Sequence, residues 1–323
     1  MNERSDNQPW LVTGSAGFLG THVVELLLAR GRRVIAVDTL AWGRRAHPSA
    51  ALAHPNFEAA EVDIRDAATL RDGCRRLRPA AVVHLAALHY IPDAEADPPR
   101  AIAINVAGTQ AVLSAALEAD VARIFVASTG DVYAPSDAPH AETDALAPFN
   151  IYGLSKLQAE QLTALAARRY PDASLTVGRL FNLYGPRETN PHILPEIFRQ
   201  LRARPEGPLR LGNTWPRRDL VPVADAARAV VELLETSTPG LETVNIATGA
   251  ARSVDEIIAT IGALLGRDFE VEVDPERVRP VERGSLRADV SRLRTRLGWT
   301  PGDDLKAGLK ALLDAEPHLL FVE

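Results

Sequence analysis

The stretch Pro9-Trp10-Leu11-Val12-Thr13-Gly14-Ser15-Ala16-Gly17-Phe18-Leu19-Gly20 decides the fold of this chain. A short apolar run ends in a turn rich in glycine, and an apolar run typical of a helix follows from Phe18 to Ala29. Gly14 can take the tight turn, Gly17 lets the main chain approach a pyrophosphate, and Gly20 lets the helix pack against the strand. The start of the helix offers unpaired N–H groups to the anion. The spacing GxxGxxG therefore predicts a strand, a turn and a helix that bind phosphate, although a plain turn can carry the same glycines.

The segment after this helix indicates the rest of the ligand. Gly31 ends the helix, Arg33–Val37 is typical of a buried second strand, and Asp38 stands at its end. A carboxylate about 20 residues beyond the glycines can accept both hydroxyls of an adenosine ribose, and it would repel a 2′-phosphate. The sequence therefore favours NAD over NADP. Arg44 and Arg45 leave NADP open, because they could receive a 2′-phosphate if their loop folds back.

Length and composition restrict the class of protein. The 323 residues suffice for one large α/β domain with a smaller lobe, or for two domains that share a cleft. The net charge of −6 is spread along the chain, so we expect no nucleic-acid partner. The single cysteine, Cys74, cannot form an internal disulfide, and no Cys/His cluster has the spacing of a metal site. Residues 1–8 lack the apolar core of a signal peptide, and no apolar run reaches membrane-spanning length, so we expect a cytoplasmic protein without a membrane partner.

Strand and helix patterns alternate through the first 182 residues. The expected strands are Phe57–Val62, Ala80–Leu85, Arg123–Ala127 and Leu175–Leu180, and the expected helices are Ala67–Leu77, Ala101–Leu117 and Ile151–Tyr170. This alternation with short connections predicts a parallel sheet covered by helices on both faces. Such sheets bind ligands at the carboxyl ends of their strands. The residues at those ends are Asp63-Ile64, suited to an adenine, the small pair Ala86-Ala87, and Ser128-Thr129.

The pattern changes past Asn182. Prolines interrupt the chain, and helices are expected at Ile193–Ala203, Val223–Glu235 and Ser253–Leu265, the last with a capping box at its start. We therefore expect an α/β fold in which residues 1–182 form a Rossmann-like domain with a doubly wound parallel sheet. Residues 183–323 would mainly form a smaller C-terminal α/β lobe at the carboxyl edge, and the chain could cross back to the sheet near 219–250.

Tyr152 and Lys156 are the candidate catalytic pair. They lie four residues apart in a segment that is typical of the start of a helix, so both side chains project from one face. The pKa of a free tyrosine, about 10, is too high for a base at neutral pH, and a neighbouring ammonium would lower it. Thr129, at the end of the preceding strand, could hydrogen-bond the same substrate hydroxyl. A half-exposed tyrosine beside a solvated lysine is the alternative, since the YxxxK pattern alone is common.

Taken together, these motifs resemble the extended short-chain dehydrogenase/reductase superfamily, and within it the NAD-dependent sugar-nucleotide epimerase/dehydratase family. The resemblance covers nearly the whole chain. It rests on the glycine turn, on Asp38 and, in order along the chain, on Asp63-Ile64, His84-Leu85-Ala86-Ala87, Asn105-Val106-Ala107-Gly108-Thr109, Ser128-Thr129, Tyr152-Gly153-Leu154-Ser155-Lys156 and Arg179-Leu180-Phe181-Asn182-Leu183-Tyr184-Gly185-Pro186.

The resemblance implies a tightly held NAD and a nucleoside-diphosphate sugar that loses hydride from C4 while Tyr152 takes the hydroxyl proton. The residues that it assigns to NAD are Gly14, Gly17, Phe18, Leu19, Asp38, Asp63, Ile64, Leu85, Ala86, Ala87, Asn105, Ser128, Tyr152 and Lys156. Those that it assigns to the substrate are His89 and Thr129 for the sugar, Asn182, Arg218 and Arg279 for the diphosphate, and Glu282 for the nucleoside ribose. Guanidinium groups suit a diphosphate because they bind oxygens in pairs. Leu220 stands where the family usually has an aromatic residue, which leaves nucleoside contacts there open.

The reaction that follows oxidation at C4 depends on the residues after the strand Arg123–Ala127. Related 4,6-dehydratases carry Thr-Asp-Glu there, and related uronate decarboxylases usually carry Thr-Ser-Glu with an arginine near the catalytic tyrosine. This chain has Thr129-Gly130-Asp131, and residues 147–151 hold no arginine. Gly130 removes the acid that a dehydratase uses, and Asp131 is one methylene shorter than glutamate. Epimerisation at C4 needs only room for the keto sugar to turn.

We therefore expect a NAD-dependent 4-epimerase of a nucleoside-diphosphate sugar of the UDP-glucose or UDP-glucuronate type. Its catalytic residues would be Thr129, Tyr152, Lys156 and Asp131. The alternatives are a UDP-glucuronate decarboxylase or a 4,6-dehydratase that uses Asp131 as an auxiliary acid or base, and a NAD-binding sensor without catalysis.

The resemblance also implies a homodimer. The expected helices Ala101–Leu117 and Ile151–Tyr170 are similar to those that pair in family dimers. Small side chains on the first of them would allow close approach, although they suit packing on the sheet equally well; these are Ala107, Ala111, Ala115 and Ala116.

Overall fold

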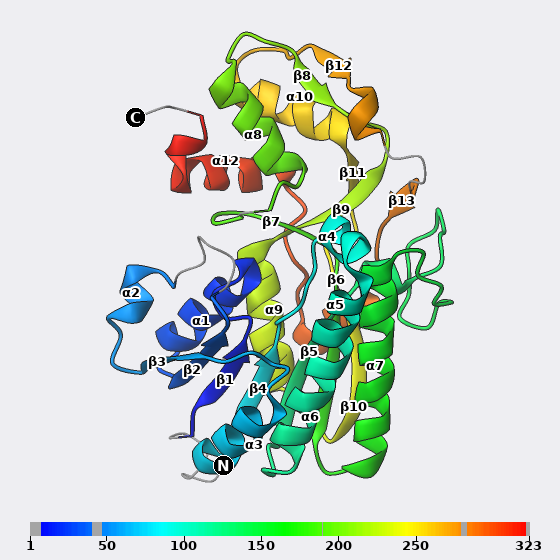
Figure 1. The fold of residues 1–323 in the computed structure, drawn as a ribbon. Helices are drawn as coiled ribbons and strands as arrows, with labels where there is room; N and C mark the ends of the chain where they lie inside the picture. The colour runs from blue at the N-terminus through cyan, green and yellow to red at the C-terminus, as the bar shows by residue number, and fades with distance from the viewer. Residues whose placement is uncertain (1–7, 41–46, 189, 279–282, 321–323) are drawn as a thin grey trace.

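The computed structural model describes residues 8–40, 47–188, 190–278 and 283–320. A large sheet is built from β1 (Trp10–Thr13), β2 (Val34–Asp38), β3 (Phe57–Glu61), β4 (Ala81–His84), β5 (Arg123–Thr129), β6 (Ser174–Leu180) and β10 (Gly240–Ile246). Its order is β10-β6-β5-β4-β1-β2-β3, and every neighbouring pair is parallel (Figure 1). The order reverses between β1 and β4, which is where such sheets bind ligands. The expected Rossmann-like α/β fold is confirmed.

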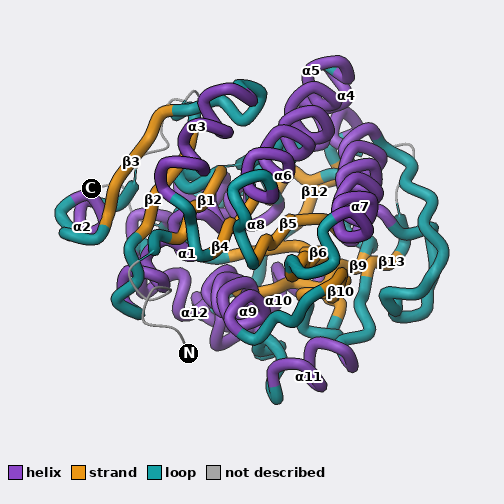
Figure 2. The backbone as a smooth tube through the Cα atoms, turned by 90° about the horizontal axis from the view of Figure 1, so that it is seen from below, coloured by secondary structure: helices purple, strands orange, loops and turns teal. Residues whose placement is uncertain are grey.

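Two layers of helices cover this sheet (Figure 2). α3 (Ala67–Leu77), α6 (Thr109–Leu117) and α7 (Ile151–Arg169) pack on one face, and α1 (Phe18–Ala29), α9 (Val223–Glu235) and α11 (Ser291–Leu297) pack on the other. Neighbouring residues of a strand point to opposite cores, as Leu11 and Val12 of β1 do. Because both faces are buried, the middle residues of β1, β2, β4 and β5 are apolar on both sides of the sheet.

Sequence periodicity located most of these elements correctly. α1, α3, α9 and α8 (Ile193–Ala203) begin and end at the expected residues. The expected capping box opens α10 (Val254–Leu265): Ser253 Oγ accepts from Glu256 N at 3.2 Å, and Ser253 N donates to Glu256 Oε2 at 2.7 Å.

The expected helix Ala101–Leu117 is instead divided. α5 (Pro98–Ile102) leads into a π-helical segment, Ala103–Gly108, which leads into α6. The run Pro98–Leu117 is long and apolar enough to cross a membrane by length and composition, contrary to our expectation for this chain. The run is apolar because it packs in the core of the protein. Half of it (50%) is buried, and its inner side packs against α3 and the large sheet.

A smaller α/β lobe lies at the carboxyl edge of the large sheet, at the top of Figure 1. Its core is enclosed by α8, α10 and α12 (Leu305–Ala315) together with the parallel pair β8 (Leu209–Leu211) and β12 (Val271–Val273). A further sheet, made of β7 (Asn182–Tyr184), β9 (Arg217–Pro222), β11 (Ala251–Ser253) and β13 (Ser285–Leu286), lies between the two lobes.

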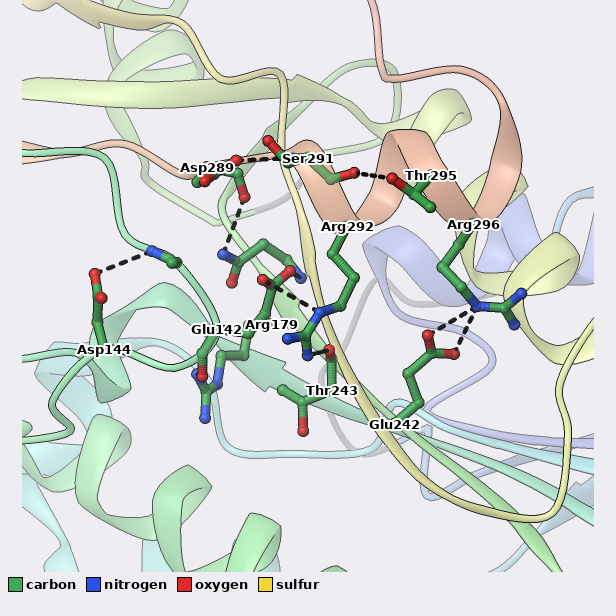
Figure 3. Close-up of polar contacts among 12 residues, drawn as sticks. Glu142, Asp144, Arg179, Glu242, Thr243, Asp289, Ser291, Arg292, Thr295 and Arg296 are labelled. Atoms are coloured by element: carbon green, nitrogen blue, oxygen red, sulfur yellow. Dashed lines mark hydrogen bonds and ion pairs between the residues drawn. The ribbon is translucent and has the colours of Figure 1, made fainter.

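The chain crosses back to the large sheet after β9. α9 covers one face of the sheet, and β10 pairs with β6 along its whole length. Polar contacts hold α11 beneath this edge (Figure 3): Arg292 Nη1 donates to Thr243 O at 2.7 Å, and Arg296 Nε pairs with Glu242 Oε1 at 2.8 Å. The domain boundary at residue 182 stays a prediction, since residues on both sides of it contribute to the sheet lobe.

Candidate active site

A cleft of about 480 Å³ opens between the carboxyl edge of the large sheet and the smaller lobe. This volume lies in the range of small-molecule sites. Predicted site residues that line the cleft are Gly14, Gly17, Phe18, Leu19, Leu85, Ala86, Ala87, His89, Ser128, Thr129, Asp131, Tyr152, Lys156, Asn182 and Arg218. The fold therefore brings together residues that are distant in the sequence, from Gly14 to Arg218.

The glycine turn is packed too tightly for side chains at two of its positions. Gly14 has φ +69°, and a Cβ there would lie 2.6 Å from Ala86 N, at the end of β4. A Cβ at Gly20 would lie 2.1 Å from Gly14 O. The first turn of α1 has no side-chain cap, so its N–H groups are available to an anion in the cleft. The turn thus fits the pyrophosphate of a dinucleotide.

Asp38 is held by the main chain of the glycine turn. Its Oδ2 accepts from Ala16 N at 3.0 Å and its Oδ1 accepts from Leu40 N at 3.1 Å. Each carboxylate oxygen can accept more than one hydrogen bond, so Asp38 can still receive ribose hydroxyls. Arg44 and Arg45, which left NADP open, lie outside the described residues.

Asp63 and Ile64 are engaged by other residues of the chain. Asp63 accepts from Arg65, with Oδ2 2.6 Å from Arg65 Nη2, and this contact lowers the pKa of the Asp63 carboxyl. Ile64 is buried, and a Cβ at Gly108 would lie 2.6 Å from Ile64 Cδ1. Neither residue is among those that line the cleft, so their contacts to an adenine stay predictions.

Thr129, Tyr152 and Lys156 lie at the inner end of the cleft. Thr129 ends β5, and Tyr152 lies in the first turn of α7, where Asn150 caps the helix by accepting from Gly153 N at 2.6 Å. Lys156 follows one turn later and is only 2% exposed. The three side chains share a wall of the cleft, as the roles predicted for them require.

The predicted electrostatics of this group needs a correction. Burial raises the pKa of Tyr152, the Asp131 carboxylate raises it further, and a hydrogen bond from Thr129 lowers it. The pKa of the phenol is therefore raised rather than lowered, contrary to our expectation, because burial and the nearby negative charge dominate. Burial lowers the pKa of Lys156 itself to about 8, and Glu160 opposes that shift.

A buried hydrogen-bonded chain lies below Lys156. His84 Nδ1 is 2.7 Å from Thr13 Oγ1, and His84 Nε2 is 2.9 Å from Thr109 Oγ1. The Thr109 hydroxyl donates its only proton to Asn105 O at 2.6 Å, so it must accept from His84 Nε2. His84 is therefore neutral with its proton on Nε2, and burial followed by repulsion from Lys156 lowers its pKa to about 3.

Asn105 is fully buried and does not line the cleft. Its Oδ1 accepts from Leu88 N at 2.7 Å, while its Nδ2 donates to Leu88 O at 3.0 Å and to Ser155 Oγ at 2.8 Å. Its side chain therefore joins the loop after β4 to the helix that carries Tyr152. Its polar atoms hold that loop, and its contact to NAD stays a prediction.

Ser128 lines the cleft, but its hydroxyl points to a buried ion pair. Ser128 Oγ donates to Glu160 Oε1, and Arg179 binds both oxygens of Glu160, at 2.9 Å through Nε and at 2.7 Å through Nη2. Arg179 and Glu160 are both buried. Paired in this way, Glu160 places a negative charge one helical turn beyond Lys156.

Three of the predicted substrate residues lie in the cleft wall. His89 Nε2 is 2.7 Å from Asn190 Nδ2, Asn182 is exposed, and Arg218 Nη1 donates to Arg217 O at 2.9 Å and to Arg283 O at 3.0 Å. The other two, Arg279 and Glu282, lie outside the described residues. Thr129, the sixth residue assigned to the substrate, also lines the cleft. All six roles stay predictions.

Sequence reasoning did not find several residues of the smaller lobe that line the cleft: His192, Glu196, Asn213 and Arg277. His192 Nδ1 pairs with Glu188 Oε1 at 2.5 Å. Burial raises the pKa of Glu196, but hydrogen bonds from Arg199 and Gln200 outweigh it and bring the pKa to about 2. These residues stand in short elements without a motif, and the helical periodicity of α8 was the only signal near them.

Gly130 follows Thr129 and has little space for a side chain. A Cβ at Gly130 would lie 3.2 Å from the ring of Phe181, which is itself buried. Contact that close requires the ring to move, and its neighbours in the core resist such movement. A carboxylic acid at this position would therefore need a repacked core.

The chain belongs to the NAD dependent epimerase/dehydratase family, which its residues 10–247 match. The protein is thus a sugar-nucleotide epimerase/dehydratase whose family depends on NAD. A putative UDP-glucose 4-epimerase from Methanocaldococcus jannaschii is 32% identical and aligns over 94% of this chain and 97% of its own. A dTDP-glucose 4,6-dehydratase from Neisseria gonorrhoeae is 30% identical over 93% of both chains.

Solved structures of epimerases share the whole fold. UDP-glucose 4-epimerase from Thermotoga maritima with UDP-glucose has a TM-score of 0.86 and 29% identity, covering 97% of this chain and 99% of that one. MoeE5 in complex with UDP-glucuronic acid and NAD has a TM-score of 0.85 and 30% identity, covering 96% and 99%. The relatives thus include proteins named as 4-epimerases and one named as a 4,6-dehydratase.

The buried position of Lys156 predicts an alkaline limit to activity. Its ammonium loses the proton as the pH rises through about 8, so a reaction that needs the charge should slow above that pH. We expect kcat at saturating substrate, measured from about pH 6 to about pH 10, to fall above pH 8. Lys156→Arg, whose charge persists over this range, should be slower but should lack that limb. An unchanged wild-type kcat across the range would contradict the need for the ammonium.

Proposed function

We propose that this protein is a NAD-dependent nucleoside-diphosphate-sugar 4-epimerase of the UDP-glucose or UDP-glucuronate type. The observation that carries the proposal is the combination of Thr129 and Tyr152 in the cleft with a glycine, Gly130, that offers no acid and is closely covered by the Phe181 ring. Oxidation at C4 needs the tyrosine. Elimination of the C6 hydroxyl needs an acid as well, and position 130, where related dehydratases carry one, has none.

The residues of the cleft support a reversible transfer at C4. Tyr152 takes the proton of the C4 hydroxyl as the C4–H bond breaks, and Thr129 holds the same oxygen. NAD, which the glycine turn and Asp38 would hold, would supply the acceptor and the donor of that hydride. After the keto sugar has turned about its link to the diphosphate, Tyr152 returns the proton to the C4 oxygen. The product then differs from the substrate only in configuration at C4.

Removing the phenol tests this assignment. Tyr152→Phe deletes one oxygen from a packed position, so the fold and bound NAD should persist while turnover falls by about 100- to 10,000-fold. The measurement is NMR of UDP-glucose, UDP-glucuronate and dTDP-glucose incubations, together with the absorbance of NAD released from the protein. Tyr170→Phe, which removes the same oxygen from a tyrosine at the other end of α7 that does not line the cleft, serves as the control. A wild-type protein that holds NAD but forms no product would instead support the sensor.

A second candidate function rests on Asp131. This carboxylate lines the cleft and is close enough to Tyr152 to raise the pKa of the phenol. In a 4-keto sugar the C5 proton is acidic, and a base at this position could remove it, as an elimination or an epimerisation at C5 requires. This observation supports a 4,6-dehydratase or a uronate decarboxylase with Asp131 as an auxiliary group.

Solvent isotope exchange separates the two candidates. In a simple 4-epimerase the hydrogen at C4 leaves and returns as hydride, so the product formed in D₂O should carry no deuterium on carbon. NMR and mass spectrometry of the recovered sugar measure this. Deuterium at C5 that disappears in Asp131→Asn would show that Asp131 acts as a base and would overturn the simpler mechanism. An Asp131→Asn protein that still epimerises without exchange would remove Asp131 from the catalytic residues.

We also infer a homodimer that pairs through α6 and α7. Leu165 and Leu154 on α7 are 59% and 41% exposed, and Ala107 just before α6 is exposed. Exposed apolar side chains of this size on neighbouring helices suit a helix–helix contact between copies. Ala115 and Ala116 do not contribute, because they are 2% and 0% exposed and pack in the core.

Light scattering tests the dimer. The wild-type chain should have a mass of about twice 34.9 kDa. Leu165→Glu places a charge in the proposed contact and should yield single chains, because a buried unpaired carboxylate opposes association. The control is Leu52→Glu, at another exposed leucine that lies outside α6 and α7. This variant should keep the wild-type mass. A monomeric wild type would contradict the inference.

A further inference from the structure

Arg283 is a buried cation of the smaller lobe that reaches the sheet lobe. It lies just before β13 and is only 5% exposed. Its Nη2 donates to Tyr133 O at 2.7 Å, and its Nη1 lies 3.5 Å from Gly130 O. These carbonyls belong to the short 3₁₀ turn Gly130–Val132 and the residue after it. The guanidinium thus binds the turn that carries Asp131 and follows Thr129.

The face of the same guanidinium contacts the approach to α7. Arg283 Cζ lies 5.1 Å from the centre of the Phe149 ring. Phe149 immediately precedes Asn150, the residue that caps α7 two positions before Tyr152. A planar guanidinium can stack on a ring while its edge donates to carbonyls, which an ammonium cannot do. One side chain therefore touches both segments that carry the candidate catalytic groups.

The main chain of Arg283 is joined to the substrate side of the cleft. Arg283 O accepts from Arg218 Nη1 at 3.0 Å, and Gly284 O accepts from Arg217 N at 2.9 Å. β13 then pairs with β9, where Leu286 stands opposite Arg218, and both of these residues line the cleft. The strand pair that carries the predicted diphosphate ligand is thus tied to the catalytic turn through Arg283.

We propose that Arg283 is a positioning residue, which holds the Gly130–Val132 turn and the start of α7 in the geometry that the reaction needs and links them to the strand pair that carries Arg218. Its own side chain does not line the cleft, so it acts through Thr129, Asp131 and Tyr152. A buried cation bonded to carbonyls is costly to remove, because the carbonyls lose a charged donor where water is excluded. The expected effect of Arg283 on catalysis rests on the proposed function. Its expected effect on the structure of residues 130–132 does not.

The test compares Arg283→Met and Arg283→Lys with a matched control. Arg292→Met also removes a guanidinium that donates at 2.7 Å to a main-chain carbonyl of the sheet lobe, but that carbonyl is Thr243 O of β10 rather than one of the catalytic turn (Figure 3). We expect Arg283→Met to lower kcat with UDP-glucose by about tenfold to a hundredfold, as small misplacements of reacting groups do. KM and bound NAD should stay near wild type, Arg283→Lys should recover part of the loss, and Arg292→Met should keep the wild-type kcat.

Hydrogen exchange supplies a readout that does not depend on turnover. Amides of residues 130–133 should exchange faster in Arg283→Met than in wild type and should be unchanged in Arg292→Met. If wild type epimerises neither UDP-glucose nor UDP-glucuronate, the proposed function fails and exchange alone decides this inference. If Arg283→Met does not fold, Arg283→Lys and Phe149→Ala decide it, since the Phe149 ring is 45% exposed and tolerates truncation. Wild-type kcat and wild-type exchange in these variants would overturn the proposal.

Discussion

The buried ammonium of Lys156 is the constraint around which the centre of this molecule is arranged. A charge in a low-dielectric interior persists only where its surroundings compensate the lost water. Glu160, one turn further along α7, provides the opposite charge, and Arg179 together with Ser128 keeps that carboxylate in place. On the other side, burial and the charge of Lys156 lower the pKa of His84 and keep it neutral, so that no second cation competes. The ends of β4, β5 and β6 and the start of α7 must keep their register for all of these groups to meet.

The glycine turn, the helix after it and the pair Tyr152 and Lys156 could be predicted because they follow local rules of sequence. The apolar run, the turn and the helix around Gly14 are set by residue size and periodicity over a few positions, and the helix α1 has the expected bounds. Tyr152 and Lys156 share a wall of the cleft because four residues make about one helical turn. Asp63 and Asn105 were assigned to the ligand, however, and both form hydrogen bonds within the chain. Asp63 accepts from Arg65, and Asn105 bonds to Leu88 and Ser155, partners that only the fold identifies.

The rest could not be predicted because it depends on distant packing. The pKa of Tyr152 is set by enclosure in a cleft that the smaller lobe closes, and no sequence spacing reports that enclosure. Glu196 lies in α8, whose bounds periodicity gave, but periodicity does not say that this face of the helix lines the cleft, and Arg277 lies in a three-residue turn that is too short for a pattern. The space next to Gly130 is filled by Phe181, which lies some 50 residues further along the chain and directly follows β6, the strand next to β5. Such a pairing appears only once β5 and β6 are side by side.

The crossing of the chain back to the large sheet makes the two halves of the sequence interdependent. β6 lies in the interior of the sheet only because β10, supplied by the second half, pairs with it from Ser174 to Leu180. A fragment that ended at residue 182 would present that row of N–H and C=O groups as an open edge, and it would lack α9 over the neighbouring core. Fragments of this kind tend to add foreign strands and aggregate. The sheet lobe is therefore completed only after most of the protein has been synthesised.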